Sequence, residues 1–289
     1  MVKTCVLLLA SALAPIPTVG VAGPVPRRAE IVVVRSGTLK LKAQLWRPEG
    51  RGPFPAVLFN HGSGRGTDTT SGRRDQANRK RQAAMLGPVF ARHGYVFLFL
   101  HRRGAGLSAG QGTYSGDLID RAFAANGQEG RNQTQLELLE TDELGDALAG
   151  LAFLRELAEV DSRRIAVAGH SFGGSITLLL AERDTTLGAV IDFASAANSW
   201  VGSPPLRARL LSAVSHITAP VLVIQAANDY SVEPARELGA EMERLGRPHR
   251  IKIYDAFGQT PEEEHSLVYL GVPIWESDVF EFLDEQMRR

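Results

Sequence analysis

A serine between two glycines, placed where an apolar strand is followed by an apolar helix, is the feature that most constrains this chain. It lies at residues 169–173, Gly-His-Ser-Phe-Gly. Residues 164–168 before it predict a buried strand, and residues 174–181 after it predict a helix. Because the two glycines permit a strained turn and a close approach of strand and helix, the Ser171 hydroxyl is expected to stand clear of the sheet. This arrangement is typical of a nucleophile elbow.

The same five-residue pattern occurs a second time, at residues 106–110, Gly-Leu-Ser-Ala-Gly. The residues that follow, 111–116, are turn formers without a helical period. Ser108 therefore lacks the helix that an elbow requires, and Ser171 is the candidate nucleophile.

The first 22 residues are expected to be a signal peptide. They begin with a short positive stretch, continue with an apolar core from Cys5 to Ala14, and end on the small residues Gly20 and Ala22. The apolar core is too short to span a bilayer. The sequence thus predicts export to a bacterial periplasm or to the outside of the cell, and a single domain at residues 23–289.

Composition narrows the chemistry of that domain. Cys5 is the only cysteine, so the exported chain is expected to have no disulfide, thiolate metal site or cysteine nucleophile. Lys plus Arg and Asp plus Glu both number 32, so no net charge attracts the chain to nucleic acid or to a membrane surface. We therefore expect neither nucleic acid as a partner nor a membrane span.

Apolar, β-branched segments alternate with helix-like stretches along the chain, which is the order expected of a mostly parallel sheet. Residues 30–36 and 38–47 alternate in polarity and predict an antiparallel opening pair. Further strands are predicted at residues 55–60, 95–100, 163–168, 188–193, 220–225 and 250–254. One long helix is expected at residues 134–160, from its leucine spacing, and a closing helix at 273–287. The fold class is α/β, with an eight-stranded sheet flanked by helices.

Two segments are candidates for covering a site. Residues 104–131 are rich in Gly, Ser, Gln and Asn, and they predict a long loop. Residues 195–215 are the only other segment that could form a cap. Because this segment is short, the cap is expected to be small or absent.

Sheet geometry restricts the partners of Ser171, because ligands bind beyond the carboxyl ends of parallel strands. In a serine hydrolase on such a sheet, the acid precedes the histidine in the chain. Asp229 follows the predicted strand 220–225 and is the candidate acid, with Asp192 and Asp255 as alternatives. His265 follows the last strand and is the candidate base, whereas His249 precedes that strand and lies at the wrong end.

Residues 60–64, Asn-His-Gly-Ser-Gly, follow a predicted strand and are expected to stabilise an oxyanion. The backbone N–H of Ser63, paired with that of Phe172, is the predicted hole, although the sequence leaves open whether Ser63 or Gly62 donates. His61 is expected to support this loop. Residues 262–264 are three glutamates before His265, and a solvated acidic loop is preferred there to a metal site because no second histidine accompanies them.

These motifs, in this order, resemble the α/β-hydrolase superfamily over residues 23–289. Asn-His-Gly-Ser-Gly, Gly-His-Ser-Phe-Gly-Gly and Asn-Asp-x-x-Val-Glu-Pro are most similar to the dienelactone hydrolase-like and prolyl-oligopeptidase-like branch. Dienelactone hydrolase has a cysteine nucleophile where this chain has Ser171, so a lactone substrate does not carry over. Peptidases of the related branch have an N-terminal propeller that is not found in this sequence.

The resemblance implies two-step acyl transfer with the triad Ser171, Asp229 and His265 and without metal or organic cofactor. Small, soluble carboxylic esters are the expected substrates, because residues 195–215 leave room only for a short cap and residues 104–131 are too polar to bind a lipid chain. The alternatives are an amidase, peptidase or acyltransferase with the same triad, or an inactive binding module on the same fold. Six basic residues follow the oxyanion loop, and a solvated basic helix is preferred there to a site for acidic substrates: Arg65, Arg73, Arg74, Arg79, Lys80 and Arg81.

Overall fold

The computed structural model describes residues 28–63 and 71–287, and the predicted signal peptide lies outside them. Within this part of the chain, eight strands form one sheet in the spatial order β1-β2-β4-β3-β5-β6-β7-β8. The strands are β1 (Glu30–Ser36), β2 (Leu39–Trp46), β3 (Phe54–Asn60), β4 (Val96–His101), β5 (Val160–His170), β6 (Ala189–Phe193), β7 (Val221–Ala226) and β8 (His249–Tyr254). β1 and β2, and β2 and β4, pair antiparallel, and all other pairs are parallel. The predicted sheet is confirmed.

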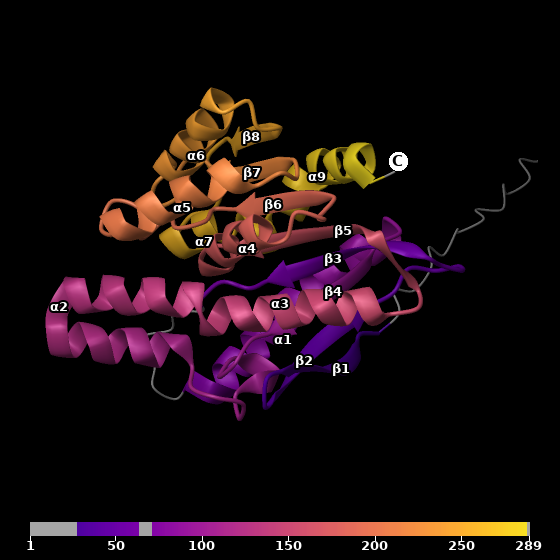
Figure 1. The fold of residues 1–289 in the computed structure, drawn as a ribbon, viewed down its shortest axis with the longest axis horizontal. Coiled ribbons are helices and arrows are strands. Elements are labelled where there is room, and N and C mark those ends of the chain that lie inside the picture. Colours follow the sequence, from indigo (N-terminus) through magenta and orange to yellow (C-terminus); the bar gives the residue numbers. More distant parts are fainter. Residues whose placement is uncertain (1–27, 64–70, 288–289) are drawn as a thin grey trace, which may run out of the picture.

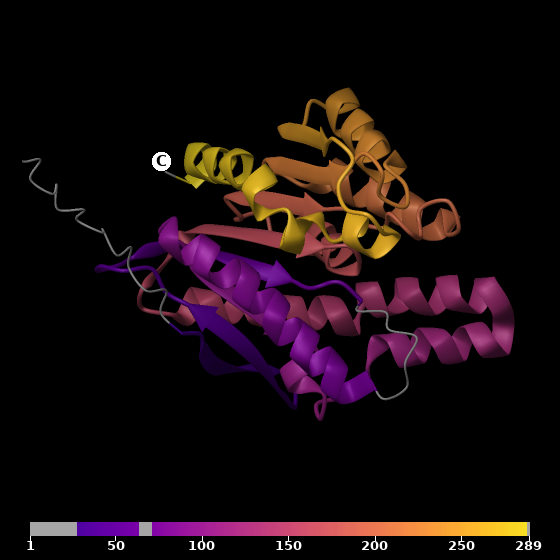
Figure 2. The same cartoon turned by 180° about the vertical axis from the view of Figure 1, so that it is seen from behind.

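Helices cover both faces of this sheet (Figures 1 and 2). They are α1 (Ser71–Arg92), α2 (Ser115–Glu140), α3 (Asp142–Glu156), α4 (Phe172–Arg183), α5 (Pro204–His216), α6 (Glu233–Arg244), α7 (Pro261–His265), α8 (Leu267–Leu270) and α9 (Val272–Met287). α3 to α6 pack on one face, and α1, α8 and α9 pack on the other. Neighbouring residues of β3 serve both cores, since Leu58 faces α3 and Phe59 faces α1.

The strand order reverses at β3, and this reversal positions the candidate site. The chain runs from β3 to β4 on one side and then returns to place β5 on the other side of β3. Asn60 is paired with Gly169, so the loop after β3 and the turn after β5 begin side by side. A ligand site is expected at such a switch point, beyond the carboxyl ends of the strands.

The prediction of a long loop at residues 104–131 is wrong. A short 3-10 turn, η1 (Gly106–Ser108), is followed by α2, which bends back on itself at Asn126 and Gly127. Gly127 has φ +62° and ψ −151°, a conformation open only to glycine. The resulting helical hairpin projects beyond the carboxyl ends of the parallel strands, on the side where α7 lies (Figures 1 and 2). A small cap therefore exists, and α2 forms it.

The single helix expected at residues 134–160 is also wrong, because the chain breaks at Thr141 between α2 and α3. Thr141 has φ −119° and ψ −93°, outside the helical region. Its hydroxyl donates a hydrogen bond to the carbonyl of Glu137 at 2.7 Å, an interaction that competes with regular helix. Leucine spacing continues across the break, which is why periodicity alone joined the two helices.

Candidate active site

Ser171 lies at a sharp turn between β5 and α4. Its backbone has φ +56° and ψ −119°, a strained conformation for a residue with a side chain. The Ser171 N–H donates to the Phe193 carbonyl at 2.9 Å, which ties the turn to β6. A Cβ atom on Gly169 or on Gly173 would lie well under 3.0 Å from backbone oxygens, of Gly173 and of Asn60 respectively. Both glycines are therefore required by close packing.

Ser108, the serine of the second Gly-x-Ser-x-Gly segment, is buried and bonded to the backbone of the sheet. It ends the η1 turn and is fully buried. Its hydroxyl donates to the His101 carbonyl at 2.6 Å and accepts from the Lys42 N–H at 2.8 Å. Both hydrogen bonds hold the turn against β2 and β4, so this hydroxyl is not presented to a substrate.

Asp229 and His265 lie on two different segments of the C-terminal region, and the fold brings their side chains together. Asp229 follows β7, His265 ends α7, and His265 Nδ1 lies 2.8 Å from Asp229 Oδ1. The carboxylate also accepts from the Tyr230 N–H at 2.7 Å and from the Gln225 side-chain amide at 3.0 Å. With Nδ1–H donating to Asp229, the other ring nitrogen, Nε2, is left able to accept a proton.

The alternative residues have other surroundings. Asp192 is completely buried, and its carboxylate accepts from the Ser195 hydroxyl at 2.5 Å and the Ser195 N–H at 3.0 Å. Burial raises the pKa of Asp192 to about 7. Asp255 is exposed, and His249 is the first residue of β8, at the amino end of the strand. Asp229 is thus the carboxylate that is bonded to His265.

His170, which sequence reasoning passed over, links the elbow to the loop that carries His265. Its Nε2 lies 2.8 Å from the backbone carbonyl of His265, and the two rings are 4.7 Å apart. Burial, and to a lesser degree the nearby His265, lowers the pKa of His170 to about 3, so the ring is neutral. A neutral imidazole with its proton on Nε2 can donate to that carbonyl. The residue beside the candidate nucleophile therefore holds the backbone of the candidate base.

The loop after β3 lies against the elbow. A Cβ atom on Gly62 would be 3.1 Å from His170 Nδ1 and 3.5 Å from Ser171 Cβ. His61 is buried, and its Nδ1 lies 2.8 Å from the Gly62 carbonyl. Burial, Arg102 and Arg79 hold the pKa of His61 well below its ordinary value, which suits a neutral support of the loop. Phe172 is the first residue of α4, where backbone N–H groups have no acceptor within the helix.

The basic residues after this loop do not all form a solvated surface. Lys80 and Arg81 are exposed, whereas Arg79 is 2% exposed and donates to the backbone carbonyls of Gly62 and Ser63. The solvated interpretation is therefore wrong for Arg79. Arg65 and the side chains of Arg73 and Arg74 lie outside the described residues. No sequence pattern distinguished Arg79 from its neighbours, because its burial depends on residues far along the chain.

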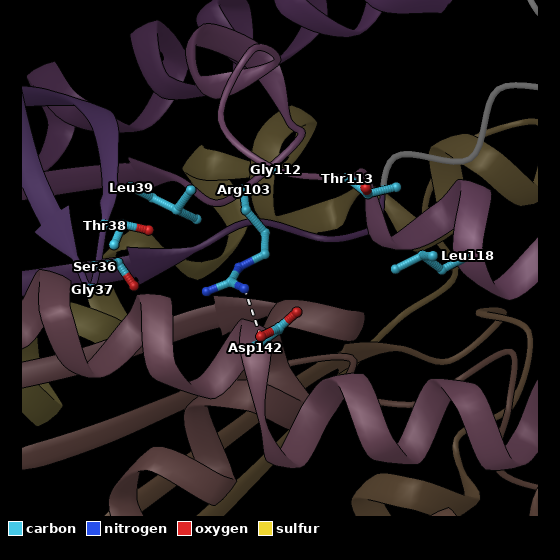
Figure 3. Close-up of a pocket in the computed structure, with 9 residues that line it drawn as sticks. All are labelled: Ser36, Gly37, Thr38, Leu39, Arg103, Gly112, Thr113, Leu118 and Asp142. Atoms are coloured by element: carbon cyan, nitrogen blue, oxygen red, sulfur yellow. Dashed lines mark ion pairs between the residues drawn. The ribbon is translucent and has the colours of Figure 1, made fainter.

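A cavity of about 450 Å³ lies elsewhere, between the β1–β2 turn, the start of α2 and the start of α3 (Figure 3). Arg103 extends into it and forms an ion pair with Asp142 at 2.6 Å (Figure 3). None of the predicted catalytic or oxyanion residues lines this cavity.

Two further properties concern the described residues only. Across residues 28–63 and 71–287, no helix combines the length and the apolar character needed to cross a membrane. Nor do three His, Cys, Asp or Glu side chains in that part of the chain cluster in a way that could hold a metal ion.

The sequence matches the family model of the X-Pro dipeptidyl-peptidases (S15 family) over residues 36–205. This span contains the Ser171 turn and the loop after β3 but ends before Asp229 and His265. The quorum-quenching protein AidA of Acinetobacter baumannii is 29% identical over 167 residues, which make up 58% of this chain and 44% of AidA. The chain thus spans less than half the length of that relative.

Solved structures with the same fold include peptidases and smaller hydrolases. The acylaminoacyl peptidase of Pyrococcus horikoshii superimposes with a TM-score of 0.61 at 17% identity, covering 92% of this chain and 43% of that one. A putative dienelactone hydrolase of Klebsiella pneumoniae gives 0.60 at 16% identity, covering 90% and 98%. Est1E of Butyrivibrio proteoclasticus gives 0.56 at 17%, covering 91% and 100%. The α/β-hydrolase fold and the predicted resemblance to this branch are confirmed.

Proposed function

The chain belongs to the family of X-Pro dipeptidyl-peptidases (S15 family), and we propose that it is a serine hydrolase of small, soluble carboxylic esters. In this proposal Ser171 is the nucleophile, His265 is the general base and Asp229 orients His265. The Ser63 and Phe172 backbone N–H groups form the oxyanion hole. No metal or organic cofactor is required for this chemistry.

The observation that carries the proposal is the Asp229–His265 hydrogen bond of 2.8 Å, on a loop that His170 ties to the strained Ser171 turn. Asp229 and His265 are separated by 36 residues in the chain, so their pairing is a product of the fold. The strained turn at Ser171, the position of His265 and the Asp229 carboxylate on His265 Nδ1 support the assignment of a nucleophilic triad.

The proposed reaction has two balanced halves. His265 Nε2 takes the Ser171 proton as Oγ bonds to the ester carbonyl carbon, and the carbonyl oxygen becomes an oxyanion that the two N–H groups stabilise. The C–O bond to the alcohol then breaks, and His265 returns the proton to the departing oxygen. Water, deprotonated by His265, repeats the sequence on the acyl-enzyme and releases the acid.

Amide cleavage is the second candidate, because the matched family is one of X-Pro dipeptidyl-peptidases. The deciding experiment compares p-nitrophenyl acetate and butyrate with p-nitroanilides of X-Pro dipeptides, using the wild type and Ser171→Ala. The ester proposal expects a higher kcat/KM on esters and covalent labelling of Ser171 by a fluorophosphonate. Efficient anilide cleavage with weak ester turnover would favour the peptidase. Absence of both labelling and turnover would favour a binding module.

Short acyl groups are the proposed preference. Trp200, Leu206 and Leu210, which could have lined a groove, are at most 1% exposed and pack in the core. A long acyl chain needs apolar wall, since each buried methylene contributes about 0.8 kcal/mol. We therefore expect catalytic efficiency to peak at acetyl to butyryl esters and to decline by about C8–C10. Efficiency that still rises at palmitoyl esters would contradict this preference.

Export is also proposed, with removal of residues 1–22. Its support is the charge and hydropathy pattern of that segment. N-terminal sequencing of protein from the culture medium or periplasm is expected to begin within a few residues of Gly23. Protein found only in the cytoplasm and beginning at Met1 or Val2 would contradict it.

A further inference from the structure

Buried arginines hold successive carbonyl groups of the oxyanion loop. Arg79, on α1, donates to the Gly62 carbonyl at 3.0 Å and to the Ser63 carbonyl at 3.1 Å. Arg102, after β4, donates to the His61 carbonyl at 2.8 Å and pairs with Glu143. Burying a guanidinium is costly unless its donors are well used. Here Arg79 donates to two backbone oxygens of the loop after β3, and its guanidinium also contacts the ring of His61.

The orientation of the Gly62–Ser63 peptide follows from this contact. The peptide is trans, since Gly52–Pro53 is the one cis bond among the described residues. In a trans peptide, the carbonyl and the N–H point in opposite directions. The Gly62 carbonyl points to Arg79, so the Ser63 N–H points away from Arg79. Gly62 itself lies against the elbow, because a Cβ atom added to it would be 3.5 Å from Ser171 Cβ.

Charge adds to this geometry. A cation on a carbonyl oxygen draws electron density from the same peptide unit and makes its N–H a stronger donor. The effect matters most where negative charge develops in a site shielded from water. Arg79 thus binds the carbonyl of the Gly62–Ser63 peptide, whose N–H is the proposed oxyanion donor. Arg79 contacts this peptide at its carbonyl oxygen, on the side opposite the Ser63 N–H.

We propose that Arg79 is a positioning residue for the oxyanion hole, which orients the Gly62–Ser63 peptide and strengthens the Ser63 N–H as a donor. This inference rests on the proposed serine hydrolase function. It also selects Ser63 over Gly62 as the donor. Tyr114, the residue before α2, donates to the Ser63 carbonyl as well, so the cap hairpin and α1 hold the same loop.

The test compares Arg79→Met and Arg79→Lys with Arg92→Met. Arg92 is on the same helix and forms a partly exposed ion pair with Glu276, so it controls for the loss of an arginine from α1. Three quantities are measured: kcat and KM on p-nitrophenyl butyrate, inhibition by an alkyl trifluoromethyl ketone, and the rate of fluorophosphonate labelling. The ketone forms a hemiketal oxyanion with the serine, so it reports on the hole directly.

Arg79→Met is expected to lower kcat about 10- to 100-fold with KM within about 3-fold, because the lost interaction acts mainly in the transition state. Affinity for the ketone should fall by a similar factor. Arg79→Lys keeps the charge but has one donor nitrogen where Arg79 uses two, so kcat and ketone affinity should each fall about 3- to 10-fold. Arg92→Met should match the wild type.

Two results would overturn the role of Arg79. One is a fall in kcat with unchanged ketone affinity and labelling rate in a folded Arg79→Met variant, as judged by circular dichroism and Tm. The other applies if Arg79→Met does not fold: Arg79→Lys then decides, and ketone affinity equal to that of the wild type contradicts the proposal. A wild-type protein that neither turns over esters nor labels would overturn the proposed function, and this inference with it.

Discussion

The segments at residues 169–173 and 106–110 have the same Gly-x-Ser-x-Gly pattern but fold differently. Ser171 stands at φ +56° between β5 and α4, whereas Ser108 ends a single 3-10 turn and is fully buried. The Ser108 hydroxyl is bonded to backbone groups of β2 and β4, at 2.8 and 2.6 Å. The comparison shows that the residues after the pattern decide whether its hydroxyl is available for chemistry.

The glycines of the two segments differ as well. Gly169 and Gly173 are packed so closely that a Cβ atom on either would overlap backbone. In the second segment, Gly106 has φ +51° and lies against His101, but Gly110 has open space where a Cβ would be. The first segment therefore uses both glycines for close approach, and the second uses only one.

The largest expected effect separates the two serines. Ser171→Ala should lower p-nitrophenyl ester hydrolysis by at least about 10³-fold, because the proposed nucleophile is removed. Ser108→Ala should retain most of the activity, since its hydroxyl is bonded to the sheet. Initial rates at saturating ester, normalised to folded protein, measure both. Equal losses, or a greater loss for Ser108→Ala, would reverse the assignment.

The matched glycines give the next largest effect. Gly173→Ala places a Cβ atom against the Asn60 carbonyl, where neither β3 nor α4 can move easily, and should cost several kcal/mol of unfolding free energy, about 3 or more. Gly110→Ala meets nothing within 4 Å and should change stability by less than about 1 kcal/mol. Urea unfolding followed by circular dichroism gives both values. A Gly173→Ala protein as stable as Gly110→Ala would show that the elbow relaxes without cost.

The sheet could be predicted because its strands carry local signals: alternating polarity in β1 and β2, and short apolar runs in the central strands. β4, Val96–His101, is buried at every position, and turn formers flank it, so residue type alone marks it. The cap could not be predicted in the same way. Two of its buried positions are Asn132 and Gln135, whose side chains bond to Gly202 and Ser199 in a distant segment. Polar residues with distant partners resemble loop residues in the sequence.

The same contrast holds within the site. The sequence predicts Ser171, Asp229 and His265 because strand ends and chain order restrict where such residues can lie. Arg79 has no comparable signal in the sequence, because two of its acceptors are backbone carbonyls, which every residue has. Gln225, a polar residue in the otherwise apolar β7, was a usable signal of the Asp229 contact.

A smaller effect tests the buried histidine beside each serine. Burial lowers the pKa of His170 and of His101 to about 3, so both are neutral when folded and take up a proton on unfolding below about pH 6.5. The stability each contributes is present above pH 6.5 and is lost as pH falls toward 3. Asp192, with its pKa raised to about 7, acts oppositely between pH 7 and 3.8. The unfolding free energy should nevertheless fall on acidification. The lowered pKa of His61, and those of ion-paired carboxylates such as Asp184, act in the same direction as His170 and His101, against Asp192.

His170→Gln and His101→Gln should each flatten that pH dependence by about 1.4 kcal/mol per pH unit between pH 6 and 4. Urea unfolding at half-unit pH steps measures the slopes, and His216→Gln, at an exposed histidine, is the control. A His170→Gln protein with the wild-type slope would mean that His170 is charged in the folded state. The hydrogen bond from His170 to the His265 carbonyl would then be donated by a charged ring and not by a neutral one.

The smallest effect reverses the order of the two serines. Ser108→Ala leaves the Lys42 N–H and the buried His101 carbonyl without the hydroxyl that joins them, which should cost about 1–3 kcal/mol of unfolding free energy. Ser171→Ala, at a partly exposed turn, should change stability by less than about 0.5 kcal/mol. Each substitution is thus expected to damage what the other preserves, activity at residue 171 and stability at residue 108. Urea midpoints measured on the proteins already assayed for ester hydrolysis complete the test. A Ser108→Ala protein as stable as the wild type would mean that water replaces the hydroxyl. The two hydrogen bonds of Ser108 would then contribute little to the unfolding free energy.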